Sequence, residues 1–153
     1  MKLKNKNFLF VCSANKQRSK TGEDYFSSLY PNLSFQSAGT NIKLCQKEGT
    51  ISITEELLVW SDIIFVMENN HSKLIKEYAS NKIATKIVIL NIEDKYKYFQ
   101  PELIEILNFY LYQRFPNIDL HFLQQIVFDK LNVFQWLSSG YQGLLGSVVN
   151  NVN

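Results

Sequence analysis

Short apolar runs separated by helical patterns are the feature that most constrains how this chain of 153 residues can fold. Phe8–Val11 and Ile63–Met67 are continuous apolar runs, and Lys86–Ile92 is largely apolar, which predicts three buried strands. Leu33–Ser37 alternates apolar and polar residues and predicts a further strand. Strands that alternate with helices form parallel sheets covered on both faces. The pattern therefore predicts an α/β fold with a four-stranded parallel sheet.

Four helices are predicted between and after these strands. Ser19–Leu29 is expected to form the first helix, and Asn70–Ala79 is expected to form another. Thr54 is an N-cap residue followed by two acids, so a short helix is expected to begin after it. Pro101 suits the first turn of a longer helix whose apolar residues recur at helical spacing. Asn41–Ile53 has a mixed pattern interrupted by a glycine, and we expect it to be a loop.

A thiol and a guanidinium stand at the two ends of one short loop between the first strand and the first helix. The loop reads Cys12-Ser13-Ala14-Asn15-Lys16-Gln17-Arg18-Ser19. Backbone N–H groups at a helix N-terminus favour an anion, and the same field favours the reactive thiolate. Taken singly, Cys12 suits a buried apolar position and Arg18 a surface charge. Together they indicate a phosphate-ester-cleaving enzyme, because the Arg18 fork can hold two phosphate oxygens.

Composition limits the other function classes. The net charge of +2 gives no electrostatic support for nucleic-acid binding. No stretch approaches the roughly 20 apolar residues that span a bilayer, and the apolar run after the N-terminal lysines is too short for a signal peptide. With Cys12 and Cys45 as the two cysteines, no disulfide framework is expected, and a reducing cytoplasm is the natural setting for a reactive thiol.

The last third of the chain has a different pattern. We expect one domain over residues 1–115 and a helical extension over residues 116–153. Between Ile118 and Leu137 a broad apolar stripe recurs at helical spacing. A helix packed on the same domain explains this stripe, and a homodimer contact or docking on a membrane surface are the alternatives. Acidic residues in the segment weaken the membrane alternative.

Further motifs follow the loop in a fixed order along the chain. They are Thr21–Glu23, Ser37–Thr40, Trp60–Glu68 with His71 following, and Ile92–Tyr98 with Pro101–Leu103 following. Together with the loop, these motifs resemble the low-molecular-weight protein tyrosine phosphatases, and in particular their compact bacterial branch. The resemblance covers residues 7 to about 112, and jointly the motifs are far more specific than the spacing of the cysteine and the arginine.

The resemblance implies a fold, an activity and a set of residue roles. The fold is a three-layer sandwich in which helices cover both faces of a four-stranded parallel sheet of strand order 2-1-3-4, with an extra C-terminal helix. The activity is that of a hydrolase, a cysteine-dependent protein tyrosine phosphatase that forms a cysteinyl-phosphate intermediate. Cys12 is then the nucleophile, Asp94 is the general acid, and Ser19 contacts the sulfur. The phosphate-binding residues are Ser13, Ala14, Asn15, Lys16, Gln17, Arg18 and Ser19.

Alternatives remain for the identity of the proton donor and for the role of two tyrosines near it in the sequence. The Asp-Pro-Tyr usual in the family becomes Asp-Lys-Tyr here. Asp94 is the preferred donor, and Glu93 and Asp62 are the alternatives to it. Tyr96 and Tyr98 are expected to wall the cleft and stack on an aromatic substrate, with plain packing as the alternative role.

Some positions depart from the family pattern. Ala14 stands where a glycine is familiar, and Gln17 replaces the second loop cysteine of many members. The protective disulfide that this cysteine would form with Cys12 is therefore unavailable. His71 is expected to be structural or on the surface, and His121 is equally isolated, so neither a metal nor another cofactor is expected.

Two other functions stay open beside the phosphatase. An arsenate reductase uses the same fold and anion loop, but it needs a thiol to resolve a cysteine–arsenic adduct, and Cys45 or glutathione would have to supply it. A non-catalytic phosphate-binding or adaptor domain would work through the C-terminal segment. The expected partner in the phosphatase reaction is a phosphorylated protein or a small phosphate ester.

Overall fold

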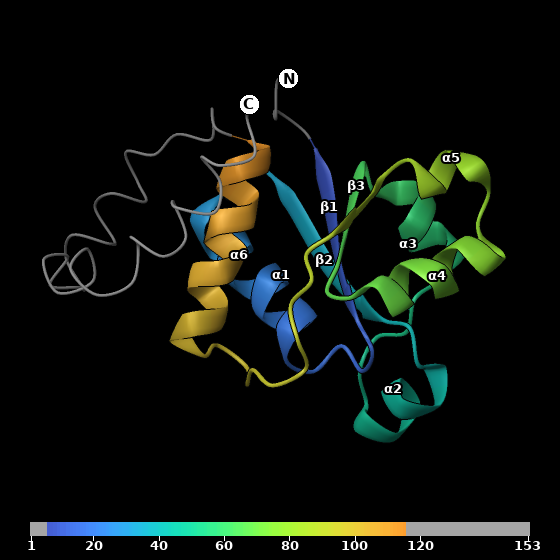
Figure 1. Ribbon diagram of the computed structural model, residues 1–153, viewed down its shortest axis with the longest axis horizontal. Coiled ribbons are helices and arrows are strands. Elements are labelled where there is room, and N and C mark those ends of the chain that lie inside the picture. The colour runs from blue at the N-terminus through green and yellow to red at the C-terminus, as the bar shows by residue number, and fades with distance from the viewer. Residues whose placement is uncertain (1–5, 116–153) are drawn as a thin grey trace, which may run out of the picture. The chain divides into compact units, whose positions relative to one another are not determined.

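The computed structural model describes residues 6–115 as a parallel sheet between two layers of helices (Figure 1). The elements are β1 (Asn7–Cys12), α1 (Arg18–Leu29), β2 (Ser34–Gly39), α2 (Ile42–Glu48), α3 (Glu55–Trp60), β3 (Ile63–Val66), α4 (Asn69–Tyr78), α5 (Asn81–Ala84), β4 (Ile87–Ile89) and α6 (Pro101–Arg114). The expected extension over residues 116–153, with its apolar stripe and its dimer contact, lies outside the described residues. Within residues 6–115, no helix has both the length and the apolar character needed to cross a membrane.

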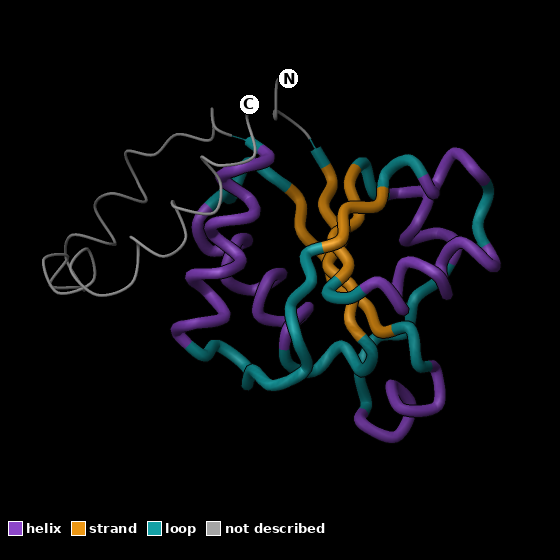
Figure 2. Tube along the Cα trace, in the orientation of Figure 1, coloured by secondary structure: helices purple, strands orange, loops and turns teal. Residues whose placement is uncertain are grey.

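All four strands run parallel, in the order β2-β1-β3-β4. Figure 2 shows the strands (orange) gathered at the centre, with helices (purple) on either side. The predicted α/β fold and strand order are therefore confirmed. In the register of β1, Cys12 pairs with Gly39 of β2, and Val11 pairs with Val66 of β3. Because the strands share one direction, their carboxyl ends meet at one edge of the sheet, and Cys12 lies at that edge.

Alternate residues of β1 face two different cores. Phe8 and Phe10 lie on the side of α1 and α6, where their rings are 5.7 Å from Phe115 and 5.6 Å from Phe26, respectively, between centroids. The opposite face is covered by α3, α4 and α5 (Figure 1). Its core contains Leu9, Val11, Leu58, Ile64, Val66, Ile75 and Ile83. The central strand is thus buried on both sides, as its continuous apolar run predicts.

Most elements begin and end near their predicted positions. Thr54 caps α3, because its hydroxyl accepts a backbone hydrogen bond at 3.3 Å from the first turn. Pro101 stands in the first turn of α6. The strand predicted over Lys86–Ile92 is shorter, because β4 ends at Ile89 and Asn91 turns the chain with a φ of 53°.

The prediction of a loop over Asn41–Ile53 is wrong for most of these residues, because α2 forms there. Asn41 caps α2 by accepting a backbone hydrogen bond at 3.0 Å, and Gly49 ends it in the left-handed region with a φ of 66°. Both signals are present in the sequence. The apolar pattern does not reveal the helix, because it has seven residues and buries only Cys45.

Gly22 lies on the side of α1 that packs on β1. A Cβ atom at this position would lie 2.8 Å from ring atoms of Phe10, whose ring is stacked between Phe26 and Phe65. We expect Gly22→Ala to lower the free energy of unfolding by up to about 2 kcal/mol, because overpacking costs about 1–3 kcal/mol and helix propensity returns about 1 kcal/mol. Urea unfolding measures the change. Ser27→Ala, at an exposed position of the same helix, is the control, and a stabilised Gly22→Ala protein would contradict the close packing.

Candidate active site

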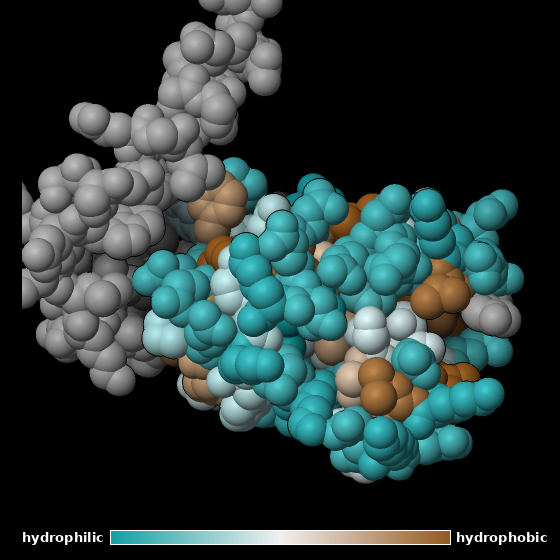
Figure 3. Space-filling view, turned by 60° about the horizontal axis from the view of Figure 1, so that its bottom comes forward, coloured by the Kyte–Doolittle hydropathy of each residue, from teal (hydrophilic) through white to brown (hydrophobic). Residues whose placement is uncertain are grey.

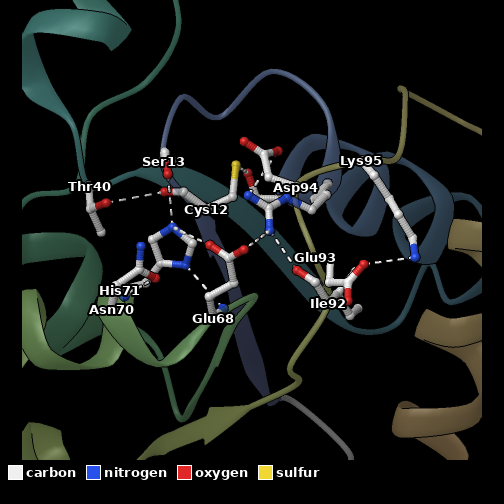
Figure 4. Close-up of polar contacts among 12 residues, drawn as sticks. Cys12, Ser13, Thr40, Glu68, Asn70, His71, Ile92, Glu93, Asp94 and Lys95 are labelled. Atoms are coloured by element: carbon white, nitrogen blue, oxygen red, sulfur yellow. Dashed lines mark hydrogen bonds and ion pairs between the residues drawn. The ribbon is translucent and has the colours of Figure 1, made fainter.

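The loop from Cys12 to Ser19 lies at the carboxyl edge of the sheet, between the end of β1 and the first turn of α1 (Figure 1). Ligands bind beyond this edge in parallel α/β folds. The segments that follow β3 and β4 reach the same edge and bring Glu68, His71 and Asp94 to the loop (Figure 4). Figure 3 brings this edge forward and shows a mostly hydrophilic surface with small, separate apolar patches.

A chain of buried polar groups ends on the sulfur of Cys12. Ser19 Oγ lies 3.0 Å from Cys12 Sγ and donates a hydrogen bond to Asn15 Oδ1 at 2.9 Å. Asn15 adopts a φ of 49°, and its Nδ2 donates to the Ser37 carbonyl at 3.2 Å, which holds this left-handed residue in place. A hydroxyl has one proton and rotates freely, so Ser19 can turn its proton to the sulfur when Cys12 is a thiolate.

Arg18 has a side chain that is only 1% exposed, although it is charged. Its Nη1 donates to the Ile92 carbonyl at 2.6 Å and lies 3.3 Å from Glu68 Oε1, and its Nη2 lies 3.0 Å from Asp94 Oδ1. Figure 4 labels the three partners, Glu68, Ile92 and Asp94, which lie close together at the site. Arg18 Nε is also buried and has no hydrogen-bond partner among residues 6–115. A buried N–H group without a partner is a candidate donor to a phosphate oxygen.

Of the three candidate proton donors, Asp94 is the one that reaches the loop. Its side chain is 69% exposed while its Oδ1 contacts the buried Arg18. Glu93 pairs instead with Lys95 at 2.8 Å, and the hydrogen bond from Lys95 lowers the pKa of the Glu93 carboxyl. Asp62 lies at the opposite end of β1, where a backbone hydrogen bond at 2.9 Å from the first residue of β1 lowers the pKa of its carboxyl. Geometry therefore favours Asp94.

His71 was expected to be structural or on the surface. It is fully buried against the loop, so the surface position is wrong. The Glu68 backbone N–H donates to His71 Nδ1 at 3.1 Å, so the neutral ring carries its proton on Nε2. Nε2 lies 3.0 Å from Ser13 Oγ and donates to it. Burial, followed by the positive charge of Arg18, lowers the pKa of His71, which keeps the ring neutral at pH 7. His71 thereby holds the Ser13 side chain.

The segment that carries the candidate acid is bound to α1. The Tyr98 backbone N–H donates to Gln17 Oε1, and the Tyr98 hydroxyl donates to Asp24 Oδ2 at 2.8 Å. Gln17, at the position of the second loop cysteine, therefore anchors this segment. The Tyr98 residue remains 47% exposed, and Tyr96 is half-buried with Lys95 Nζ 5.4 Å from the centre of its ring. Both tyrosines thus belong to the segment that follows the candidate acid.

The structure brings together most of the predicted residues and adds others that the sequence reasoning missed. Cys12, Arg18, Ser19 and Asp94 converge, whereas Lys16 turns to the rim and pairs with an acid of α2. Glu68 was missed as a partner of the guanidinium. Its place directly after β3, the neighbour of β1, could have identified it, because carboxyl ends of adjacent parallel strands lie close together. Residues 40–50, which contact the loop, were missed because their helix was missed.

A guanidinium and a thiol in one loop, with a carboxyl group in contact with the guanidinium, form an arrangement that can bind an oxyanion and act on it. Among residues 6–115, no three His, Cys, Asp or Glu side chains come together as a metal site.

Comparison with solved structures finds the same fold in several phosphatases. The low-molecular-weight phosphotyrosine phosphatase of Vibrio cholerae O395 is similar with a TM-score of 0.56 and 16% identity, over 75% of this chain and 99% of that one. The tyrosine phosphatase Wzb of Escherichia coli K30, solved in complex with phosphate, has a TM-score of 0.56 and 20% identity over 74% and 99% of the two chains. The YwlE arginine phosphatase of Geobacillus stearothermophilus has a TM-score of 0.54 and 17% identity over 83% and 98%.

No protein-family model matches the chain, and no curated protein matches it. The TM-scores of 0.54 to 0.56 establish a common fold, and at identities of 16% to 20% the likeness is one of fold alone. The fold implied by the motifs is confirmed: the chain has the fold of the low-molecular-weight protein tyrosine phosphatases.

Proposed function

We propose that the chain is a cysteine-dependent phosphatase of the low-molecular-weight type, which hydrolyses phosphate monoesters. The observation that carries this proposal is the position of Arg18. Its buried guanidinium belongs to the loop that begins at Cys12, and it lies 3.0 Å from the Asp94 carboxylate. An anion clamp, a thiol and an acid are thus within reach of one phosphate group.

In the first step the Cys12 thiolate attacks phosphorus, so that a sulfur–phosphorus bond forms as the ester phosphorus–oxygen bond breaks. Arg18 and the loop N–H groups hold the other phosphate oxygens as charge develops on them. Asp94, carrying a proton, donates it to the departing oxygen.

In the second step water attacks the phosphorus of the cysteinyl phosphate. The Asp94 carboxylate takes a proton from this water, and the sulfur–phosphorus bond breaks. Ser19, 3.0 Å from the sulfur, donates its hydroxyl proton in a hydrogen bond that stabilises the departing thiolate. The cycle releases the alcohol and inorganic phosphate and consumes only water. Its free thiolate requires a reducing compartment, which supports a cytoplasmic site of action.

Cys12→Ser is expected to abolish hydrolysis of p-nitrophenyl phosphate while phosphate still binds, because Arg18 and the loop N–H groups remain. Steady-state assays measure the first effect and titration calorimetry the second. Cys45 is unchanged in this variant, so retained hydrolysis would show that Cys12 is not the nucleophile. An inactive wild-type protein that binds phosphopeptides would instead favour a non-catalytic phosphate-binding domain.

Asp94→Asn is expected to lower kcat for the same substrate by about 10²–10⁴-fold, the usual loss when a general acid is removed. The amide keeps the size of the side chain but cannot supply the proton. Glu93→Gln is the matched control, because Glu93 is the adjacent carboxylate and pairs away from the loop. Full activity of the Asp94 variant, or an equal loss in the Glu93 variant, would refute the assignment of Asp94.

We further propose that the substrate is protein phosphotyrosine. This proposal is supported by the exposed Tyr98 and the half-buried Tyr96, which follow Asp94 in the same segment and offer aromatic rings to stack on an aromatic ester. Aromatic pairs contribute about 0.5–1.5 kcal/mol, so Tyr98→Ala should lower kcat/KM for phenyl phosphate about two- to tenfold while leaving an alkyl phosphate nearly unaffected. Equal losses on both esters, faster hydrolysis of phosphoarginine, or arsenate-dependent oxidation of glutathione would contradict this substrate.

A further inference from the structure

The N–H groups of an anion-binding loop can converge on a ligand only if the carbonyl groups of the same peptides point away from it. A trans peptide is planar, so the carbonyl of one residue and the N–H of the next point in opposite directions. Carbonyls turned inward into protein need donors of their own, because a buried unpaired carbonyl is costly. The partners of the loop carbonyls therefore help to decide where the loop N–H groups point.

The first two loop carbonyls accept hydrogen bonds from the backbone directly after β2. The Cys12 carbonyl accepts from the Thr40 N–H at 2.9 Å, and the Ser13 carbonyl accepts from the Asn41 N–H at 3.0 Å. These bonds use main-chain donors, so they do not depend on which side chains stand at positions 40 and 41. They turn the N–H groups of Ser13 and Ala14 to the opposite side.

The third loop carbonyl accepts its hydrogen bond from a side chain. The Ala14 carbonyl accepts a hydrogen bond at 2.5 Å from Thr50 Oγ1, and the same peptide carries the N–H of Asn15. Asn15 is the loop residue with a positive φ, so this peptide is the one whose orientation is least favoured by the local backbone. Thr50 is itself fixed, because its N–H donates to the Cys45 carbonyl at 2.9 Å.

The helix α2 explains how Thr50 reaches the loop. It carries the chain away from Asn41 and returns it after Gly49, so that residues 40–50 close against the loop (Figure 1). The fit is tight at Gly39, where a Cβ atom would lie 2.6 Å from the Ser13 carbonyl oxygen and 2.4 Å from Cys45 Sγ. The ion pair that α2 makes with the loop lysine is exposed on the lysine side and contributes little to this arrangement.

We propose that Thr50 is a positioning residue of the phosphate site: its hydroxyl holds the Ala14 carbonyl outward and thereby directs the Asn15 N–H toward the bound oxyanion. This inference rests on the proposed phosphatase function. It also gives α2, which the sequence pattern did not reveal, a role in building the site. In this role Thr50 acts through the loop, because its hydroxyl donates to a loop carbonyl.

Thr50→Val tests the inference, because valine keeps the branched shape and the backbone donor and removes the hydroxyl. The full-length variant should bind tungstate, an oxyanion probe, about three- to tenfold more weakly, which corresponds to the loss of one neutral hydrogen bond. Its kcat/KM for p-nitrophenyl phosphate should fall by a similar factor. A mere loss of folded protein would instead lower the number of sites in titration calorimetry and leave the dissociation constant unchanged.

Two further variants make the result specific. Thr50→Ser restores a hydroxyl and should recover most of the affinity. Thr85→Val removes a threonine hydroxyl that donates at 2.8 Å to the Lys82 carbonyl at the end of α5, and it should bind tungstate as the wild type does.

Unchanged tungstate affinity in Thr50→Val, an equal loss in Thr50→Ser, or an equal loss in Thr85→Val would overturn the role of Thr50 while leaving the phosphatase function intact. A wild-type protein that neither binds tungstate nor hydrolyses the ester would overturn both proposals together.

Discussion

The buried guanidinium of Arg18 ties together segments that are distant in sequence. A charge in this setting is destabilising by several kcal/mol unless it is paired and hydrogen-bonded. Its partners are Glu68 after β3, and Ile92 and Asp94 after β4. Those partners reach it because the order β2-β1-β3-β4 places the strand ends beside the loop. The low-cost burial of the guanidinium therefore depends on the assembled sheet.

A second constraint acts on the backbone of the loop. The peptides that would offer N–H groups to an anion must point their carbonyls away from it. Residues 40–50 donate hydrogen bonds to three successive carbonyls of the loop. His71 adds a neutral donor to the Ser13 hydroxyl, and Asn15 and Ser19 link the loop to β2 and to the sulfur. The loop is thus held in shape by its surroundings before any ligand binds, and such preorganisation is what stabilises developing charge without later rearrangement.

Sequence reasoning succeeded where a local pattern carries the information. The continuous apolar run of β1 and the cap residue Thr54 both led to correct elements. It failed at α2. The cap residue Asn41 and the terminating Gly49 are both in the sequence, but the helix buries only one residue and so has no apolar pattern that reveals it. It also placed Gln17 in the phosphate-binding loop without its contact to Tyr98, because Tyr98 lies 81 positions away in the chain.

The amino-acid sequence by itself determined the alternation of buried strands and helices, and it placed a cysteine and an arginine in one loop between a strand and a helix. These features follow from short-range chemistry: apolar periodicity, capping and the spacing of two residues within one loop. Only the tertiary structure decided that Asp94 meets the guanidinium, that Asp62 lies at the far end of β1, and that residues 40–50 orient the loop carbonyls. Those contacts join segments far apart in the chain, so they exist only once strand order and packing have brought the segments together.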